Sequence, residues 1–115
     1  MENNAAIEAL PRLWESALRS AFQKKRLESA GLRNPPDSLH AFQTTVPFTT
    51  KGDLVADQAA HPPYGTVLTE PLTRYTRCHQ TSGTTGVPLR WLDTPESWDA
   101  MVQDWQEVLK SAGVV

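Results

Sequence analysis

Apolar residues recur at helical spacing in the first part of the chain. Pro11 has no backbone N–H and suits the first position of a helix, so we expect the regular helix to begin there and to run to about residue 28. Trp14 and Phe22 are predicted to lie in the core rather than to stack on a ligand. The positions that define the period are Ile7, Leu10, Trp14, Ala17, Leu18, Ala21 and Phe22.

The basic residues Lys24, Lys25 and Arg26 lie near the expected C-terminal end of this helix. Cations at that end interact favourably with the helix dipole. We therefore interpret these residues as a solvated face, in preference to a contact for an anionic ligand.

The middle of the chain is divided by prolines and turn residues into short elements. A single helical turn is expected over residues 39–43. A longer helix is expected over residues 51–60, because Thr50 is a favourable N-cap residue. Lys51 falls in the first turn of this helix and is predicted to be exposed rather than catalytic. Residues 66–69 have the composition of a short edge strand.

The last part of the chain predicts a strand–loop–strand–helix unit. Residues 73–80 and 89–92 are expected to be strands, and residues 81–88 connect them. The helix is expected to begin at Pro95, since a capping residue precedes this proline, and to end at Gly113. An apolar stripe along the helix predicts that it packs against a sheet. The stripe consists of Trp98, Met101, Val102, Trp105, Val108, Leu109 and Ala112.

The connection between the two strands is made almost entirely of small residues. It reads Thr81-Ser82-Gly83-Thr84-Thr85-Gly86-Val87-Pro88. The glycines permit positive φ angles and bring N–H groups close to a ligand, and the hydroxyl groups add donors. A turn that directs several donors at one point forms an anion-binding nest, and the usual anion is a phosphate. The alternative is an ordinary Ser/Thr/Gly loop that only joins two strands.

The loop differs from two well-known nucleotide-binding motifs. A Walker A loop requires a lysine after its last glycine, whereas Val87 follows Gly86. The dinucleotide fingerprint requires a helix that opens at the glycines, and none is predicted here. A small nucleotide-hydrolysing protein is also disfavoured, because the sequence near the loop offers no acidic residue for a metal ion.

Residues 81–88 resemble the phosphate-binding loop of the adenylate-forming (AMP-binding) superfamily of acyl-CoA synthetases and adenylation domains. The loop of that superfamily reads Thr-Ser-Gly-Thr-Thr-Gly-x-Pro, and every specified position matches. Residues 46–54 look like the Pro-Phe-Thr-Thr-Lys segment of the phenylacetate–CoA ligase branch, and residues 77–80 are also similar to that branch. The resemblance extends from about Leu10 to the C-terminus.

This resemblance implies that the loop binds the phosphates of ATP. The family often has a lysine after the second loop glycine or after the proline, where this chain has Val87 and Leu89, and the nearest cation is Arg90. Arg90 and His79 are the candidate nearby contacts, and the alternative for His79 is a hydrogen-bonded structural histidine. The implied phosphate-binding residues are Thr81, Ser82, Gly83, Thr84, Thr85 and Gly86.

By the same resemblance, the parent protein would be an ATP-dependent carboxylate–CoA ligase. Such a ligase converts a carboxylic acid, here expected to be an aryl acid such as phenylacetate, to an acyl-adenylate and then to an acyl-CoA, with ATP, Mg²⁺ and CoA. The family's catalytic lysine and acidic metal ligand have no counterpart in this chain. No catalytic or metal-binding residue is therefore predicted, and the chain alone is expected to be inactive. The alternative is a non-catalytic interaction module, whose Trp-rich helix docks on a partner and whose loop is a relic.

The predicted fold class is α/β, in an incomplete form. Residues 1–65 are expected to form a mainly helical N-terminal segment, and residues 66–115 the start of the AMP-binding domain. The few short strands cannot cover the apolar helix faces, and a two-stranded sheet alone is marginal in water. We therefore expect an N-terminal fragment of a ligase, from a truncated or a split gene, with the missing C-terminal remainder as its partner.

Composition and charge narrow the remaining functional classes and the expected location of the protein. The net charge of −2 gives no nucleic-acid-binding footprint, and no apolar run is long enough to span a membrane. Cys78 is the only cysteine; it excludes an internal disulfide, suits a reducing compartment and is predicted to be a small buried hydrophobe. The N-terminus lacks the features of a signal peptide, so a cytoplasmic location is expected.

Overall fold

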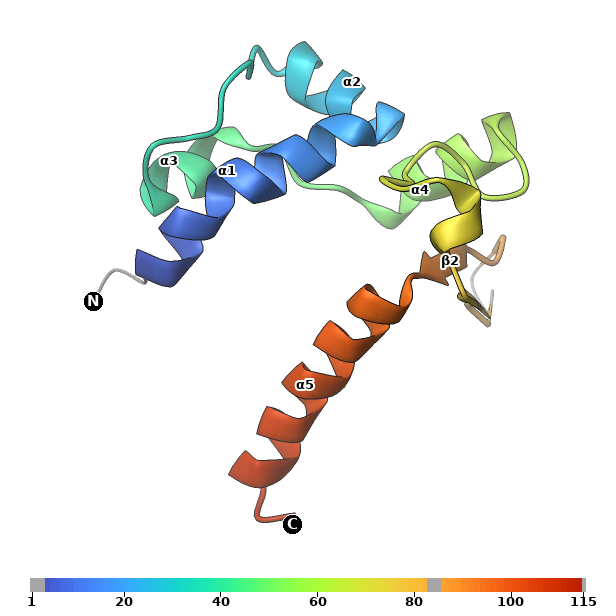
Figure 1. Ribbon diagram of the computed structural model, residues 1–115. Helices are drawn as coiled ribbons and strands as arrows, with labels where there is room; N and C mark the ends of the chain where they lie inside the picture. The colour runs from blue at the N-terminus through green and yellow to red at the C-terminus, as the bar shows by residue number, and fades with distance from the viewer. Residues whose placement is uncertain (1–3, 83–85, 115) are drawn as a thin grey trace. The chain divides into compact units, whose positions relative to one another are not determined.

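The computed structural model describes residues 4–82 and 86–114 of the chain. The chain forms two compact units, the first ending at Glu70 and the second beginning at Pro71. The first unit contains α1 (Asn4–Arg19), α2 (Ala21–Ser29), α3 (Leu39–Thr45) and α4 (Lys51–Ala60), and the second contains η1 (Leu72–Arg74), β1 (Arg77–Gln80), β2 (Arg90–Asp93) and α5 (Pro95–Ser111) (Figure 1). Helices and an antiparallel sheet together confirm the α/β prediction.

The predicted helix start at Pro11 is wrong, because α1 begins at Asn4 and contains Pro11 in its interior. A proline inside a helix removes one backbone hydrogen bond. Leu10 and Trp14 lie about one turn apart and are both buried. The burial of this face offsets the bond that Pro11 cannot make.

A break at Ser20 divides what the sequence predicted as one helix into α1 and α2. Ser20 is fully buried. Its hydroxyl accepts a hydrogen bond from the Gln23 N–H at 3.3 Å and donates to the Thr66 carbonyl at 3.3 Å. Serine followed three residues later by glutamine is the sequence pattern of a capping box. This pattern could have located the boundary, but the helical apolar period runs across it.

The core of the first unit is formed by Leu10, Trp14 and Leu27, each of which is buried. This confirms the prediction for Trp14. Phe22 is only half-buried, so its predicted place in the core is wrong. Its ring lies instead beside the Arg26 guanidinium, whose carbon is 5.4 Å from the ring centroid.

The helix predicted over residues 51–60 is confirmed with the same bounds. Thr50 and Asp53 form a reciprocal capping box at its start, which fixes the first turn. Lys51 is exposed, as predicted. The short helix α3 ends two residues beyond the predicted turn, at Thr45.

The predicted edge strand at residues 66–69 is absent, and this segment contains a turn residue, a bend residue and two residues without regular structure. Both oxygens of Asp57 accept hydrogen bonds from Thr66, one from its N–H and one from its hydroxyl, each at 2.6 Å. The Thr66 carbonyl accepts from Phe22 N–H at 3.1 Å. These contacts to helices use the backbone groups of Thr66 that a strand would need for its ladder.

The second unit is built on a β-hairpin. β1 and β2 pair antiparallel, in a register that places Arg77 opposite Asp93 and Gln80 opposite Arg90. The first half of the predicted strand 73–80 is wrong, because residues 72–74 form the 3₁₀ helix η1. The Arg74 N–H there donates to the Pro71 carbonyl, which is turn geometry rather than strand geometry.

The C-terminal helix α5 follows the hairpin directly and matches its prediction at both ends. Thr94 is its N-cap and forms a capping box with Ser97, and Pro95 occupies the first helical position. Gly113 has a φ of +79° and ends the helix in the left-handed conformation that glycine favours. None of the helices in the described part of the chain is long and apolar enough to cross a bilayer.

Candidate phosphate-loop site

The predicted phosphate loop closes the β-hairpin. The Thr81 N–H donates to the Leu89 carbonyl at 2.9 Å, and the Leu89 N–H donates to the Thr81 hydroxyl oxygen at 2.8 Å. The first bond continues the β1–β2 register by one residue pair, and the second uses the side chain of Thr81 instead of its backbone. Leu89 is 5% exposed, so Thr81 anchors the base of the loop to a buried residue. The sequence presented Thr81 only as a phosphate donor, and this second role of its hydroxyl was missed.

Gly86 lies near the other end of the loop, with a φ of +149°. A Cβ at this position would meet no heavy atom within 4 Å, so the backbone conformation, rather than lack of space, requires glycine. Ser82, which follows Thr81 at the base of the loop, is exposed. Gly83, Thr84 and Thr85 lie outside the described residues, and their part in phosphate binding stays a prediction.

His79 is held just before the loop by a stack on α5. Its ring lies 5.0 Å from the Trp98 ring, centroid to centroid, with an interplanar angle of 16°. The Arg77 guanidinium carbon lies 4.5 Å from the centroid of the same indole. His79 Nε2 is also 3.9 Å from Asp93 Oδ2. These contacts give His79 a structural role, and its contact with ATP stays a prediction.

The two candidate contacts beside the loop, His79 and Arg90, lie on opposite faces of the hairpin. Arg90 pairs with Gln80 in the register, whereas His79 pairs with Trp91. Neighbouring residues of a strand point to opposite faces, so Arg90 shares a face with Gln80 and not with His79. The structure therefore does not bring the two candidates together.

Cys78 is exposed, so the prediction that it is buried is wrong. It lies opposite Leu92, on the face of the hairpin away from His79. Helix α5 contacts the His79 face, through Trp98. All four residues of β1 are exposed, so this two-stranded sheet leaves even the residues on the face that α5 contacts accessible to solvent.

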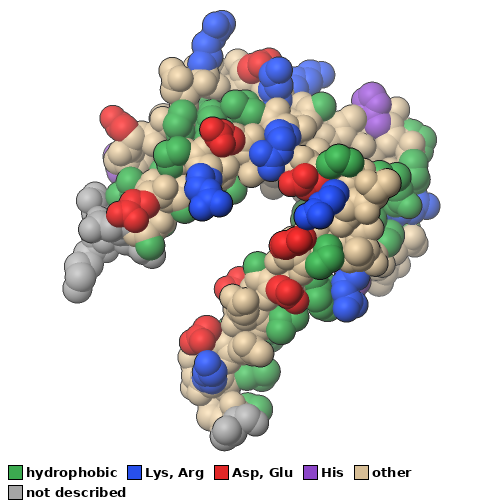
Figure 2. Space-filling view, in the orientation of Figure 1, with side chains coloured by type: hydrophobic (Ala, Val, Ile, Leu, Met, Phe, Trp, Pro, Cys, Tyr) green, Lys and Arg blue, Asp and Glu red, His purple; other side chains and the backbone are tan. Residues whose placement is uncertain are grey.

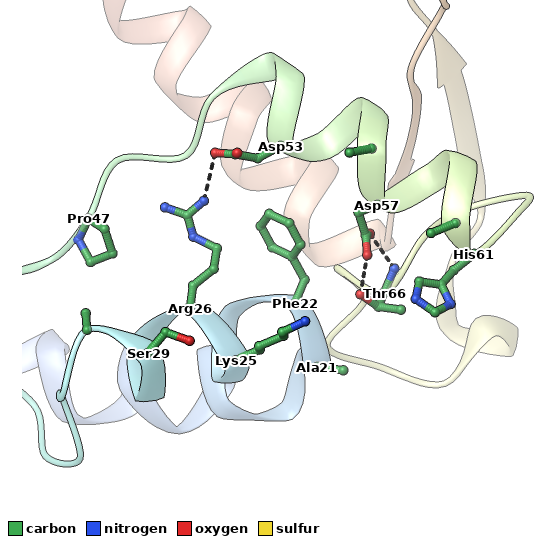
Figure 3. A pocket seen from close by; sticks show the side chains of 13 residues that line it. Ala21, Phe22, Lys25, Arg26, Ser29, Pro47, Asp53, Asp57, His61 and Thr66 are labelled. Atoms are coloured by element: carbon green, nitrogen blue, oxygen red, sulfur yellow. Dashed lines mark hydrogen bonds and ion pairs between the residues drawn. The ribbon is translucent and has the colours of Figure 1, made fainter.

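The first unit contains an open pocket of ≈ 830 Å³ between α2 and α4, which the sequence did not indicate (Figure 3). Arg26 crosses it to donate to Asp53 Oδ2 at 3.1 Å and to the Phe48 carbonyl. Since the Arg26 side chain is only 17% exposed, its predicted solvated position is wrong. Four alanines line much of the remaining wall, together with Lys25, His61 and the hydrogen-bonded pair Asp57 and Thr66.

Hydrogen bonds around this pocket also affect Asp53. The backbone N–H of Thr50, then its side chain, and finally the Arg26 guanidinium hold the pKa of Asp53 below its usual value. The carboxylate is therefore stabilised as a structural acceptor. Throughout the described residues, no three His, Cys, Asp or Glu side chains gather at a place that could hold a metal ion.

Solved structures of 2-hydroxyisobutyryl-CoA ligase are similar to this chain. The ligase in complex with 2-HIB-AMP and CoA in the thioesterification state is 32% identical, with a TM-score of 0.77 over 89% of this chain and 22% of that chain. The ligase with 2-HIB-AMP in the postadenylation state is 30% identical, with a TM-score of 0.75 over 85% of this chain and 20% of that chain. Comparisons with protein-family models and with curated proteins gave no match.

The chain thus spans about a fifth of the length of the ligases that it matches. Its phosphate-loop sequence and its structural likeness agree. Together they identify the chain as the counterpart of one part of an adenylate-forming acyl-CoA ligase.

Proposed function

We propose that this chain is the N-terminal, phosphate-binding part of an ATP-dependent carboxylate–CoA ligase. The observation that carries the proposal is the position of the loop sequence 81–88 at the end of a β-hairpin. The surrounding chain is similar over 85–89% of its length to ligases that were solved with an acyl-adenylate. In the proposed domain division, residues 1–65 are a helical segment and residues 66–115 begin the AMP-binding domain.

The chemistry of the loop suits the first half-reaction. A carboxylate oxygen of the acid attacks the α-phosphorus of ATP, the bond to the bridging oxygen breaks, and pyrophosphate leaves. Donors from such a loop stabilise the charge that develops on this leaving group. The proposed donors are the backbone N–H groups and hydroxyls of Thr81, Ser82, Gly83, Thr84, Thr85 and Gly86.

The hydrogen bond between Thr81 and Leu89 is compatible with this role. The Thr81 hydroxyl oxygen accepts from Leu89, and a hydroxyl that accepts one bond still has its own proton to donate. The Mg²⁺ ion expected with ATP finds no cluster of ligands among the described residues. In this proposal its protein ligands, the CoA site and the catalytic residues lie on other parts of the enzyme.

The acid is proposed to be an aryl acid such as phenylacetate, on the resemblance of residues 46–54 to that branch. The solved relatives act on a different acid, 2-hydroxyisobutyrate, according to their names. A cytoplasmic location is part of the same proposal. The alternative function, a non-catalytic interaction module, is favoured by a single observation, the exposed apolar side chains of α5.

The test is a chimeric ligase in which this chain replaces the matching segment of 2-hydroxyisobutyryl-CoA ligase. Pyrophosphate release measures adenylation, and supplied acyl-adenylate with CoA measures thioester formation. Replacing Thr84 and Thr85 with valine keeps their shape and removes their hydroxyls. Each lost hydrogen bond to a charged phosphate costs about 1.5–3 kcal/mol. The double variant should therefore lose adenylation and keep most of its thioester formation, because pyrophosphate has already left.

The matched control replaces the same two threonines with serine, which restores the donors. Recovery of adenylation by the serine variant supports the phosphate role. Equal losses in both half-reactions, together with a lower melting temperature, would show that the threonines only shape the loop. An inactive chimera that binds no ATP would overturn the proposed function itself.

A further inference from the structure

Helix α5 has an apolar side that its own unit leaves uncovered. Trp105 is 58% exposed and Val108 is 55% exposed, although both are large hydrophobic residues. Figure 2 shows hydrophobic side chains along this helix, next to acidic ones. We call these exposed residues the α5 stripe. It consists of Met101, Val102, Trp105, Val108 and Leu109.

The hairpin is too small to cover the stripe. α5 contains 17 residues, which corresponds to about 25 Å at 1.5 Å per residue. Each strand contains four residues, or about 14 Å. Trp98, in the first turns of α5, reaches the sheet and contacts His79 and Arg77. The stripe begins one turn later, and in Figure 1 the helix extends well beyond the hairpin.

The hairpin also has open edges. The sheet contains β1 and β2 only, so within the described residues each strand has one edge without a neighbouring strand. Open edges are templates for further strands. Strands added there would widen the sheet on the side where α5 packs, and could then cover the stripe.

The comparison with solved structures indicates where such strands come from. This chain matches 20–22% of the chain of 2-hydroxyisobutyryl-CoA ligase. We infer that the α5 stripe is the docking surface for the remaining part of an adenylate-forming ligase fold, which adds strands to the hairpin and buries the stripe. This inference rests on the proposed function, and it holds whether that part lies on the same polypeptide or on another.

A second copy of this chain fits the stripe less well. At about 100° per residue, Asp99 and Asp104 fall along the two sides of the stripe. Residues 91–115 contain five acidic residues and a single lysine. Two stripes packed face to face would bring these acidic borders together, and like charges at an interface oppose association.

The test is co-expression of the complete 115-residue chain with 2-hydroxyisobutyryl-CoA ligase that lacks the matching segment, here called the ligase remainder. We expect a soluble one-to-one complex, measured by size-exclusion chromatography with light scattering. Trp105→Glu places a charge in the centre of the stripe and should reduce the yield of complex at least about tenfold. Gln103→Glu adds the same charge on the side of α5 opposite the stripe, at about 100° per residue, and should leave the yield unchanged. Circular dichroism of each isolated variant checks that α5 remains folded.

The outcomes separate the inference from the proposed function. A complex that forms and is lost with Trp105→Glu, but makes no acyl-adenylate, supports the docking surface and counts against the ligase function. No complex, or a complex insensitive to Trp105→Glu, overturns the docking surface. A wild-type chain that self-associates through Trp105 and ignores the ligase remainder assigns the stripe to a second copy, which also overturns the inference.

Discussion

Replacing Thr81 with valine tests whether its hydroxyl holds the base of the phosphate loop. Valine has nearly the same shape but cannot accept the hydrogen bond that Leu89 N–H donates at 2.8 Å. Leu89 is 5% exposed, so water does not easily replace the lost acceptor. A buried donor without a partner costs about 1–3 kcal/mol.

This cost should appear as faster exchange of the Leu89 amide proton. Because about 1.4 kcal/mol corresponds to a factor of ten in an equilibrium constant, local opening of the hairpin should become about 5 to 150 times more frequent. Hydrogen–deuterium exchange of the ¹⁵N-labelled chain, followed by NMR, measures this change directly. Amides in the middle of α5 serve as an internal reference and should exchange at the wild-type rate.

Thr81→Ser is the matched control, since serine keeps the oxygen that accepts from Leu89. It should exchange at close to the wild-type rate at Leu89. If Thr81→Val also leaves the Leu89 amide at its wild-type rate, the hydroxyl does not anchor the loop and the reasoning fails. In the chimeric ligase, serine preserves both anchoring and phosphate binding and valine removes both, so the pair tests the Thr81 hydroxyl without dividing its two roles.

Three further predictions concern the contacts around the two units. Ser20→Ala removes a buried N-cap and the bond to Thr66, and should lower the free energy of unfolding by about 1–2 kcal/mol in urea titrations. Folding lowers the pKa of Asp53, so the stabilising effect of its carboxylate is present above the pKa in the unfolded chain and is lost as the pH falls through the pKa in the folded chain. Asp53→Asn should therefore reduce the fall of the melting temperature at acidic pH. Trp98→Ala removes the ring that His79 stacks on, and should speed exchange of the β1 amides.

Two of these predictions have a control in the chain. Ser29 is exposed near the end of α2, so Ser29→Ala should change the free energy of unfolding by less than about 0.5 kcal/mol. Trp105 is largely exposed, and Trp105→Ala should leave β1 exchange unchanged. If the melting temperature of Asp53→Asn depends on pH as that of the wild type does, Asp53 does not contribute to stability at acidic pH. Equal effects of Ser20→Ala and Ser29→Ala would contradict the N-cap role of Ser20.

The sequence predicted correctly those elements whose signals are local. Thr50 and Thr94 are capping residues that fix helix starts through bonds within a single turn, and these bonds form whatever surrounds the helix. The loop pattern is local in the same sense, because its residues follow one another in one short connection between β1 and β2, but its phosphate-binding role stays a prediction. For such elements, the residue types and their spacing determine most of the local structure.

The errors fall where distant contacts decide the structure. Pro11 stays inside α1 because Leu10 and Trp14 bury one face, and residues 66–69 form no strand because Asp57 and the start of α2 take the polar groups of Thr66. Cys78 is exposed, like every other residue of β1, because the sheet in the described residues has only two strands. The burial of a strand residue depends on how many strands and helices pack against it. The alternation of residue types along the sequence does not reveal that number. The same dependence explains the exposed side of α5: its apolar pattern is that of a helix in a larger sheet domain, so the pattern is evidence for surfaces that the two strands described here do not supply.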